Sequence, residues 1–476
     1  MTAPAQEPRA PEAVASLRSL LGTGSVLAGA DVPARNRQDW STLSPVSPLA
    51  VVRPADPAGV AAALRVANEH GLAVVPQGGL TGLAGGARPI EGALALSLER
   101  LVGIEDIDSA AATMTVRAGT TLEAVQQAAE AAGFLFALDL GSRGSCTIGG
   151  NIATNAGGNR VIRYGMMREM VLGLEAALPD GTLVSSMNKL LKNNAGYDLK
   201  HLFIGSEGTL GVVTRAVLRL HPQPRCTMAA LCGLANYEKT LAVLASARNA
   251  LGPLLSAFEV MWSGYWALAM KASTTREPLS GNHAFYVLVE AQGSAASDEA
   301  KFDAWLESLA EKALVDDAAV ARSIGDVKAF WAARDAAAEF RQILGPHASY
   351  DIGLSVAAMD AYAEACGREL AARVEGCVSA FYGHIADGNM HIVACVPGAA
   401  IQPFGAIDAV VYRLVGEFGG AISAEHGIGL IKKPYLGFSR NPQELALMRT
   451  LKRAIDPKGT LNPGKVIEVR RAPSGC

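Results

Sequence analysis

Three stretches of this chain are rich in glycine, and the longest carries almost no large side chains. That stretch is LDLGSRGSCTIGGNIATNAGGN at residues 138–159, and the others lie at 76–86 and within 193–214. A segment this bare cannot bury a hydrophobic core of its own, yet glycine lets the backbone approach another body closely. The pattern therefore predicts that these stretches surround a large, flat ligand with polar edges.

Composition excludes several other classes of protein. The 50 glycines among 476 residues have no three-residue period, which excludes a collagen helix. Half of the residues are hydrophobic, which excludes a disordered chain. The 42 Lys and Arg against 45 Asp and Glu leave a net charge of -3, which argues against nucleic acid as a partner. At roughly 150 residues per domain, the length predicts two or three domains.

The chain shows no targeting or membrane signal. Its start, MTAPAQEPRAPEAV, has prolines and acids where a secretory signal has a charged start and an apolar run. No stretch reaches the roughly 18 consecutive apolar residues of a transmembrane helix. Seven scattered cysteines without a Cys-x-x-Cys pair suit a reduced compartment and indicate no iron–sulfur or zinc-ribbon site. We therefore expect a cytoplasmic protein without an integral membrane segment.

Strand and helix signals divide the chain into regions. A helical segment is expected at 11–21, and strand and helix patterns then alternate from about residue 48 to 221. The prolines of HPQPRC, at 221–226, indicate a linker. The region beyond it mixes strands and alanine-rich helices, which is typical of an α+β domain. The strands are expected at 283–293, 376–385 and 389–397, and the helices at 297–314, 326–344 and 357–374.

The first glycine stretch, PQGGLTGLAGG, follows a strand that looks buried. Consecutive glycines allow several backbone N–H groups to point at one anion. It is neither the G-x-G-x-x-G turn of dinucleotide-binding folds, because no long helix follows, nor a Walker A loop, because Gly-Lys-Ser/Thr is absent. Taken alone, this segment is equally compatible with a structural turn.

Taken together, the stretches resemble a known family. PQGGLTG (76–82), IGGNIATNAGG (148–158) and GSEGTLGVVT (205–214) closely resemble the FAD-binding domain of vanillyl-alcohol-oxidase-type flavoproteins. The C-terminal motifs resemble the D-2-hydroxyacid dehydrogenases, which act on D-lactate, D-2-hydroxyglutarate or glycolate. The resemblance covers about residues 46–470.

This resemblance implies an α+β fold with four parts. An N-terminal helical segment (1–45) precedes a vanillyl-alcohol-oxidase-type (PCMH-type) FAD-binding domain (46–224). A substrate or cap domain with an antiparallel sheet (225–425) follows, and a C-terminal helical segment (426–476) returns to the FAD site.

The resemblance also implies which residues hold FAD. The 76–82 loop cradles the pyrophosphate, and the later stretches line the adenine, ribose and isoalloxazine. The residues assigned to FAD are Pro76, Gly78, Gly79, Leu80, Thr81, Gly82, Leu83, Leu140, Gly144, Ser145, Ile148, Gly149, Asn151, Ala153, Thr154, Gly157, Gly158, Val161, Gly211, Val212, Val213 and Asn462. No histidine lies in the first loop, and Cys146 stands where hydroxyacid enzymes carry a cysteine without a flavin bond. We therefore expect non-covalent FAD, with Cys146 serving in packing.

Two histidines flank a tight turn in the second region. His384 and His391 bracket IADGNM between two apolar strands, and Asp-Gly is a strong hairpin signal. A hairpin there brings both imidazoles to the same end of a strand pair. Glu425 and His426 follow in EHGIG. Two His and one Glu are ordinary ligands of zinc or manganese, but the spacing alone is equally compatible with a hydrogen-bonded polar cluster.

The resemblance assigns roles to these residues. G-H-x-x-D-G-N-x-H with E-H-G-I-G implies that His384, His391 and Glu425 bind a divalent metal, zinc or manganese, and lie at the substrate. His426 is then the catalytic base, which takes the hydroxyl proton while flavin N5 takes the hydride. A metal ion at the hydroxyl would act as a Lewis acid and bring that proton within reach of a neutral imidazole.

The remaining substrate contacts bear on which acid is oxidised. Its carboxylate needs a cation, ideally a guanidinium, and Arg334 matches the substrate arginine of the family; we also assign Tyr350 to substrate binding. The hydroxyglutarate branch has threonine, lysine and asparagine where this chain has Ala338, Ser349 and Val393. We therefore favour D-lactate or a related short or apolar D-2-hydroxyacid over D-2-hydroxyglutarate.

Several alternatives stay open at this point. Arg341 or Lys432 could replace the missing cation and restore D-2-hydroxyglutarate as substrate. An oxidase, a flavin subunit of a glycolate oxidase-like complex and a non-catalytic binding module are the other interpretations. The family implies an external electron acceptor, either a quinone or an electron-transfer flavoprotein, and a homodimer is a further expectation.

Overall fold

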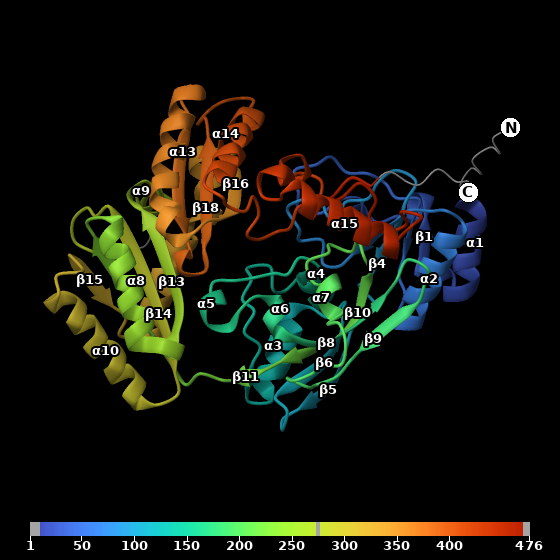
Figure 1. The fold of residues 1–476 in the computed structure, drawn as a ribbon, viewed down its shortest axis with the longest axis horizontal. Helices are drawn as coiled ribbons and strands as arrows, with labels where there is room; N and C mark the ends of the chain where they lie inside the picture. Colours follow the sequence, from blue (N-terminus) through green and yellow to red (C-terminus); the bar gives the residue numbers. More distant parts are fainter. Residues whose placement is uncertain (1–9, 273–276, 470–476) are drawn as a thin grey trace. The chain divides into compact units, whose positions relative to one another are not determined.

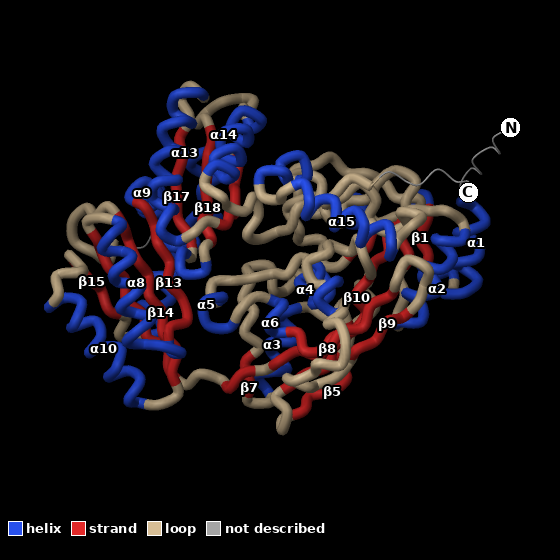
Figure 2. The backbone as a smooth tube through the Cα atoms, in the orientation of Figure 1, coloured by secondary structure: helices blue, strands red, loops and turns tan. Residues whose placement is uncertain are grey.

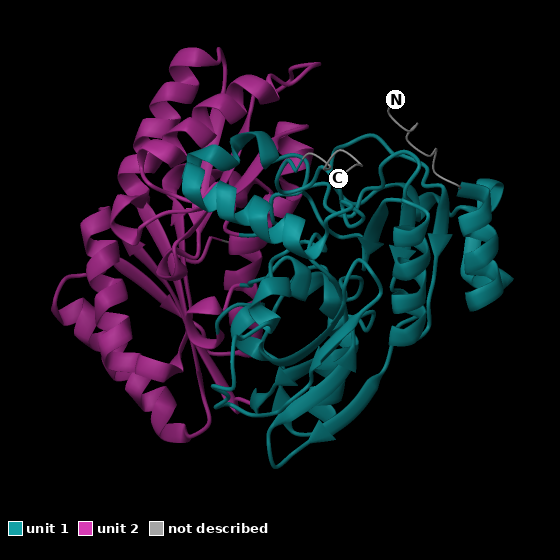
Figure 3. Ribbon diagram, turned by 45° about the vertical axis from the view of Figure 1, so that its right-hand side comes forward, with its two compact units in different colours: residues 1–158, 165–222, 425–476 teal, residues 159–164, 223–424 magenta. Residues whose placement is uncertain are grey.

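The computed structural model describes residues 10–272 and 277–469, and the chain divides into two compact units. Unit 1 comprises Met1–Gly158, Gly165–Pro222 and Glu425–Cys476, and unit 2 comprises Asn159–Tyr164 and Gln223–Ala424 (Figure 3). The expected N-terminal and C-terminal helical segments therefore both fall in unit 1. Residues 1–9 and 470–476 of those segments, with Cys476, lie outside the described residues.

Unit 1 contains a four-stranded sheet in the order β1-β2-β4-β3. Strands β2 and β3 both run parallel to β4, whereas β1 and β2 are antiparallel. The bounds are β1 Val26–Ala28, β2 Ala50–Val52, β3 Val74–Gln77 and β4 Leu94–Ser97. Helix α2 (Pro57–Glu69) connects β2 to β3, and it begins where predicted because the Asp56 side chain accepts a hydrogen bond from the Gly59 amide at 2.7 Å.

A second sheet of unit 1 is antiparallel, in the order β5-β6-β10-β8-β9. The bounds are β5 Ile104–Asp108, β6 Thr113–Arg117, β8 Val171–Ala177, β9 Leu183–Ser186 and β10 Val212–Arg219. Central strand β10 begins directly after the GSEGTLG motif, so this glycine stretch leads into the middle strand of the sheet (Figure 1).

The helices of unit 1 are α1 Ala10–Leu21, α2, α3 Leu122–Ala131, α4 Ile148–Ala153, α6 Met167–Met170, α7 Lys200–Phe203 and α15 Pro442–Ile455. The 3₁₀ segments are Thr23–Ser25, Gly29–Asp31, Ala34–Arg37 and Lys433–Phe438, and β7 (Phe134–Leu135) pairs with β11 (His221–Pro222). Much of this unit is loop, as Figure 2 shows. No helix in the described part of the chain is long and apolar enough to cross a bilayer.

Unit 2 is built on one seven-stranded antiparallel sheet, in the order β15-β12-β14-β13-β17-β18-β16. The bounds are β12 Cys226–Leu234, β13 Leu255–Trp262, β14 Phe285–Gly293, β15 Asp317–Val320, β16 Ala348–Gly353, β17 Val378–Gly383 and β18 Asn389–Cys395. The predicted antiparallel sheet of the cap domain is thereby confirmed, and so is the α+β class.

Helices cover both faces of this sheet. Those of unit 2 are α5 Val161–Tyr164, α8 Tyr237–Leu251, α9 Ser263–Ala272, α10 Ala296–Glu311, α11 Ile324–Arg334, α12 Phe340–Leu344, α13 Met359–Arg373 and α14 Phe404–Glu417. The short 3₁₀ segments are Gly252–Leu254, Asp335–Glu339, Val356–Ala358 and Ile385–Asp387. Helices α8, α10, α13 and α14 lie on one face (Figure 1), and α9, α11 and α12 cover the other.

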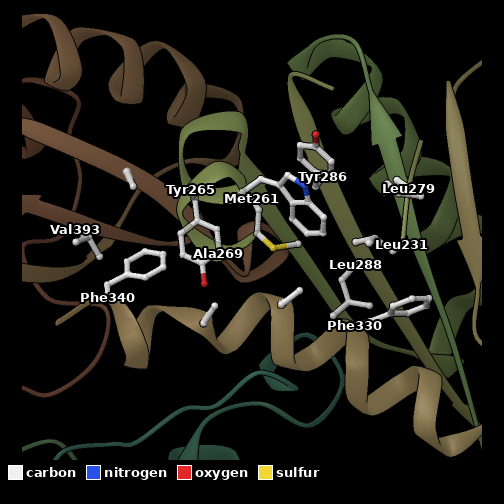
Figure 4. Packing of buried hydrophobic residues seen from close by; sticks show 14 of the residues in the cluster. Leu231, Met261, Tyr265, Ala269, Leu279, Tyr286, Leu288, Phe330, Phe340 and Val393 are labelled. Atoms are coloured by element: carbon white, nitrogen blue, oxygen red, sulfur yellow. The ribbon is translucent and has the colours of Figure 1, made fainter. Parts of the chain in front are cut away.

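The face under α9, α11 and α12 forms a large apolar core. Tyr265 and Phe340 are fully buried there, and Val393 of β18 is 3% exposed. Figure 4 shows these side chains with Met261 and Leu288 of the central strands. The same face also carries charged residues at one end, which form the polar part of the candidate site.

Candidate functional site

The first two glycine stretches pack against each other within unit 1. A Cβ at Gly79 would lie 2.8 Å from the Cα of Cys146 and overlap the carbonyl oxygen of Ser145. A Cβ at Gly78 would lie 2.5 Å from Oγ1 of Thr147. Glycine is therefore required here for contact between two loops of the protein itself, in addition to any approach of a ligand.

Other glycines of these loops face open space. No heavy atom lies within 4 Å of a Cβ placed at Gly82 or Gly141. Leu80 lies between β3 and Gly82 in the sequence. It has a positive φ of 63°, and its carbonyl oxygen accepts a hydrogen bond from the Trp40 amide at 3.1 Å. The loop is thus held in a fixed, partly left-handed form with bare backbone beside it, which fits a bound cofactor.

The third stretch is tied to the other two by Asn462 and Glu207. The Asn462 side-chain amide donates to the carbonyl oxygens of Gly86, at 3.2 Å, and of Glu207, at 2.7 Å. The Glu207 amide donates to the carbonyl oxygen of Ala153 at 2.8 Å. Segments that are far apart in sequence therefore meet around these two buried residues.

All residues assigned to FAD lie in unit 1 except Val161, which belongs to α5 of unit 2. Their surroundings differ, because Asn151 is 4% exposed whereas Leu83 is 44% exposed. Cys146 is buried, and burial raises the pKa of its thiol, which the nearby Ser142 and Asn151 lower in part. A thiol in this state is a weak nucleophile.

The segment that carries His426 has a strained backbone. His426, Gly427 and Gly429 have φ values of 63°, 76° and 51°. This region costs a non-glycine residue of order 1–3 kcal/mol. The amides of Leu430 and Ile431 donate to the carbonyl oxygen of Ala84 in the first glycine stretch, at 2.8 and 3.1 Å, and so fix the end of the segment.

Glu207 holds the same segment from another side. Its carboxylate accepts from the amides of Ile428, at 2.7 Å, and Gly429, at 2.9 Å. Burial raises the pKa of this carboxyl group, and the two amide bonds and the neighbouring Lys432 and Lys465 lower it in part. The loop of the predicted base is therefore connected to all three glycine stretches.

The predicted hairpin in unit 2 brings two imidazoles together. His384 follows β17 and His391 lies on β18, and their ring centroids are 5.2 Å apart. Nδ1 of His384 lies 2.6 Å from Oδ2 of Asp387, and its Nε2 lies 3.0 Å from the side-chain nitrogen of Asn389. An ionised carboxylate only accepts hydrogen bonds, so Nδ1 carries the proton.

His391 has the same arrangement with different partners. Its Nδ1 lies 2.5 Å from Oδ1 of Asp351, the residue directly opposite on β16. Its Nε2 accepts from Nη2 of Arg334 at 3.2 Å. Both imidazoles thus present a basic Nε2, which is the form that binds a metal ion, with the carboxylate on Nδ1 that often accompanies such ligands.

Arg334 ends α11 and is 8% exposed. Its Nε donates to Oε2 of the fully buried Glu259 at 2.7 Å, and its Nη1 pairs with Asp335 at 3.1 Å. The guanidinium carbon also lies 5.4 Å from the ring centroid of Tyr382. Each terminal nitrogen carries a second N–H group, so a carboxylate can still bind to this cation.

The structure does not bring Tyr350 to this cluster. Side chains alternate between the faces of a strand, and Tyr350 pairs with Ile392 while Asp351 pairs with His391. The Tyr350 hydroxyl instead donates to Asp408 of α14 at 2.5 Å on the opposite face. Val393, by contrast, lies on the same face as His391, two residues along β18.

Four acidic residues of these sites were missed in the sequence. Asp387 and Asp351 were visible only as a turn residue and as the neighbour of Tyr350. Glu259 had a usable signal, because it is a lone charge in the apolar strand LSAFEVMW. Glu207 was part of a glycine motif and had no separate signal.

The predicted metal ligands are divided between the units. His384 and His391 belong to unit 2, and Glu425 and His426 belong to unit 1. No group of three or more His, Cys, Asp or Glu suited to a metal ion occurs among residues 10–272 and 277–469.

Comparison with known proteins identifies the family. A model of the FAD binding domain matches residues 48–186, and a model of the C-terminal domain of FAD linked oxidases matches residues 223–466. The chain belongs to the FAD-linked oxidase family. The matched FAD-binding domain contains the first two glycine stretches, so FAD is the cofactor, and the expected flavoprotein family is confirmed.

Relatives within this family cover nearly the whole chain. A D-2-hydroxyglutarate dehydrogenase of Xanthomonas citri pv. viticola is 40% identical, over 92% of this chain and 93% of the relative. The mitochondrial D-2-hydroxyglutarate dehydrogenase of Danio rerio is 37% identical, over 96% and 85%. A putative mitochondrial D-lactate dehydrogenase of Schizosaccharomyces pombe is 36% identical, over 94% and 89%.

Solved structures confirm the fold. A p-cresol methylhydroxylase aligns with a TM-score of 0.78 at 18% identity, over 96% of this chain and 97% of that chain. An alkyldihydroxyacetonephosphate synthase aligns with a TM-score of 0.73 at 17% identity, over 98% and 86%. The vanillyl-alcohol-oxidase-type architecture predicted from the glycine motifs is therefore the one that the chain adopts.

Proposed function

We propose that this enzyme oxidises a D-2-hydroxyacid to the corresponding 2-oxoacid, with FAD as its cofactor. One observation carries the proposal: Arg334 and the basic Nε2 of His391 lie 3.2 Å apart on one face of the unit 2 sheet. A 2-hydroxyacid has adjacent carboxylate and hydroxyl groups, and a cation for the carboxylate beside an imidazole that can hold a metal ion at the hydroxyl suits both.

The residues of the chain have separate tasks in this reaction. Arg334 binds the substrate carboxylate, and Glu259 keeps the guanidinium in place beneath it. His426 accepts the hydroxyl proton as general base. FAD, when bound, supplies the acceptor for the hydride.

A divalent metal is part of the proposal. The buried imidazoles of His384 and His391 fit such an ion, since a carboxylate on each Nδ1 leaves each Nε2 basic. The assignment of Glu425 as third ligand, and of zinc or manganese as the ion, rests on the motif resemblance. The ion, when bound, supplies Lewis-acid polarisation of the substrate hydroxyl.

Binding of FAD without a covalent bond is also proposed. The first glycine stretch, residues 76–86, contains no histidine. Cys146 is 3% exposed, and burial raises the pKa of its thiol, which suits packing better than attack on a flavin.

We favour D-lactate or another short or apolar D-2-hydroxyacid as the substrate. Val393 supports this choice, because this buried apolar residue lies on the His391 face of the sheet, two residues along β18, where the hydroxyglutarate branch has asparagine. D-2-Hydroxyglutarate is the second candidate, and the names of the Xanthomonas and Danio relatives favour it.

The deciding experiment is anaerobic mixing of the FAD-loaded protein with D-lactate, L-lactate, D-2-hydroxyglutarate and glycolate. Bleaching of the visible flavin band by a D-hydroxyacid, and by D-lactate faster than by D-2-hydroxyglutarate, is the expected result. A flavin that no D-hydroxyacid reduces would remove the proposed substrate class. Faster bleaching by D-2-hydroxyglutarate would replace D-lactate with the second candidate.

The electron acceptor, the oligomeric state and the cellular location are also proposed. A quinone or an electron-transfer flavoprotein as electron acceptor, a homodimer and a cytoplasmic location rest on the family and on the cysteine pattern. Relatives with mitochondrial names occur in eukaryotes, whereas the name of the Xanthomonas relative carries no compartment.

A further inference from the structure

Glu207 is buried at the point where the three glycine stretches and the EHGIG segment meet in unit 1. Its main chain is fixed from both sides. The amide donates to Ala153 at 2.8 Å, and the carbonyl oxygen accepts from the Asn462 side chain at 2.7 Å. The side chain therefore extends from a backbone that is hydrogen-bonded on both sides.

Both carboxylate oxygens of Glu207 accept hydrogen bonds from one short segment. Oε1 accepts from the Ile428 amide at 2.7 Å, and Oε2 accepts from the Gly429 amide at 2.9 Å. These amides lie two and three residues after His426. They lie outside any helix or strand, so the carboxylate stands in for the partners that regular structure would provide.

The segment leaves no room between itself and this carboxylate. A Cβ at Gly427 would lie 2.6 Å from Cδ of Glu207. His426 immediately precedes that contact, in a left-handed conformation with φ 63° that is uncommon for residues other than glycine. Such a conformation persists only where surrounding contacts hold it, and Glu207 supplies two of them.

We propose that Glu207 is a positioning residue that fixes the backbone at His426 and so aims its imidazole at the substrate proton. The inference rests on the proposed role of His426 as base. Glu207 acts through the two backbone amides that it holds. Only a carboxylate does this, because glutamine would turn an NH₂ group toward one of the two N–H donors.

The test is a double-mutant cycle on the rate of anaerobic flavin reduction by the best D-hydroxyacid. Glu207→Gln should slow reduction about 10–100-fold, as expected when a catalytic group is displaced by about 1 Å. In the His426→Ala background the same substitution should change the rate less than about threefold, since no base is left to position. FAD content and melting temperature are measured for every variant.

Asp456→Asn is the matched control. Asp456 is also buried in unit 1, and its two oxygens accept from the amides of Thr460 and Leu461, each at 2.8 Å, while Oδ2 also accepts from Nζ of Lys452 at 2.5 Å. Asp456→Asn weakens a similar pair of carboxylate–amide hydrogen bonds outside the EHGIG segment. It should lower the melting temperature, while any change in rate should be the same with and without His426.

Each outcome decides a different point. Equal losses from Glu207→Gln with and without His426, or no loss at all, would overturn the positioning role while leaving the base intact. A His426→Ala enzyme that reduces its flavin at the full rate would overturn the proposed base and this inference with it. If Glu207→Gln does not retain FAD, Gly427→Ala displaces the same contact and must show the same dependence on His426.

Discussion

Asp351 accepts a hydrogen bond from Nδ1 of His391 at 2.5 Å, across two neighbouring strands of the unit 2 sheet. Asp387 does the same for His384 at 2.6 Å. Because both protons sit on Nδ1, both Nε2 atoms are basic, and in this structure they accept hydrogen bonds from Asn389 and Arg334. The tautomers of the two imidazoles are thus set by two carboxylates, of which Asp387 belongs to the motif by which the histidines are recognised and Asp351 does not.

Replacing Asp351 by asparagine should therefore weaken metal binding. An amide can hold the ring but no longer raises its basicity, and loss of such a partner typically costs 10–100-fold in metal affinity or activity. The affinity of the Asp351→Asn enzyme for Zn²⁺ and Mn²⁺ can be measured by titration calorimetry, beside its rate of flavin reduction.

Asp408→Asn is the control for that substitution. Asp408 of α14 accepts a hydrogen bond from the Tyr350 hydroxyl, and Tyr350 lies on the opposite face of β16 from Asp351. Metal affinity should stay within about twofold of the native value, since the Tyr350 contact lies on the opposite face of the sheet from the two imidazoles. Equal metal affinities for the Asp351→Asn and native proteins would contradict the role given to Asp351.

Only part of this site could be predicted from the sequence. The hairpin of His384 and His391 was predictable, because an Asp-Gly turn between apolar strands is a local signal. Asp351 was not, because it lies 40 residues from His391 and their contact depends on the register of β16 against β18. Tyr350 was assigned to the site for its place in sequence, whereas strand alternation directs it to the other face.

The ion pair of Glu259 and Arg334 should be a strong determinant of stability. Glu259 is fully buried and Arg334 nearly so, and removing one partner of a buried pair typically costs about 3–5 kcal/mol because the other charge stays uncompensated. Glu259→Gln should lower the free energy of unfolding by about that amount, as measured by urea denaturation.

Asp335→Asn provides the comparison on the same guanidinium. The Asp335 side chain is 56% exposed, and a pair with one exposed partner contributes about 0–1 kcal/mol. If Glu259→Gln and Asp335→Asn lower the free energy of unfolding by similar amounts, burial does not determine the strength of the pair of Glu259 and Arg334.

Helix boundaries near Arg334 show where local patterns fail. The sequence predicts one helix at 326–344, but the structure has α11, a 3₁₀ segment and α12. The Tyr265 hydroxyl donates to the carbonyl oxygen of Arg334 and accepts from the amide of Ala337 at 3.3 Å. A side chain inserted into the helix ladder in this way causes a break, and no pattern within 326–344 reports it.

Contact between the first two glycine stretches should be essential for holding FAD. Gly79→Ala places a methyl group against Ser145 and Cys146, so one loop must shift. We expect a lower melting temperature and purified protein with little flavin, as measured by its visible spectrum. Gly82→Ala, three residues on, meets no protein atom within 4 Å and should leave the melting temperature of the FAD-free protein unchanged. Full flavin content in Gly79→Ala would contradict the requirement for this contact.

Val393 should help to determine which acid is oxidised. Val393→Asn adds an amide on the face that carries His391, and it should raise the ratio of kcat/KM for D-2-hydroxyglutarate over D-lactate about tenfold or more. Burying the amide should also cost about 1–3 kcal/mol of stability. Val393→Thr, which keeps the volume but has a shorter polar reach, should leave the ratio nearly unchanged. An unaltered ratio in Val393→Asn would exclude this position as a determinant.

Lys465 should make stability depend on pH in the alkaline range. It is 1% exposed and donates to the carbonyl oxygens of Gly86 and Arg88 at 2.7 and 2.6 Å. Burial lowers the pKa of its ammonium group to about 7 from 10.5, against the opposing influence of Asp39 and Glu207. Between these two pH values the unfolded chain binds more protons than the folded one, so stability should rise as the pH rises from about 7 toward 10.5.

The measurement is urea unfolding of the native and Lys465→Met proteins from pH 7 to 10. As the pH rises, the free energy of unfolding of the native protein should increase relative to that of the variant by at most about 1.4 kcal/mol per pH unit. The control is Lys458→Met, because Lys458 is exposed and donates to the carbonyl oxygen of Asn68 at 3.1 Å. Its difference from the native protein should be the same at every pH. A constant difference for Lys465→Met as well would mean that the buried ammonium keeps its proton throughout this range.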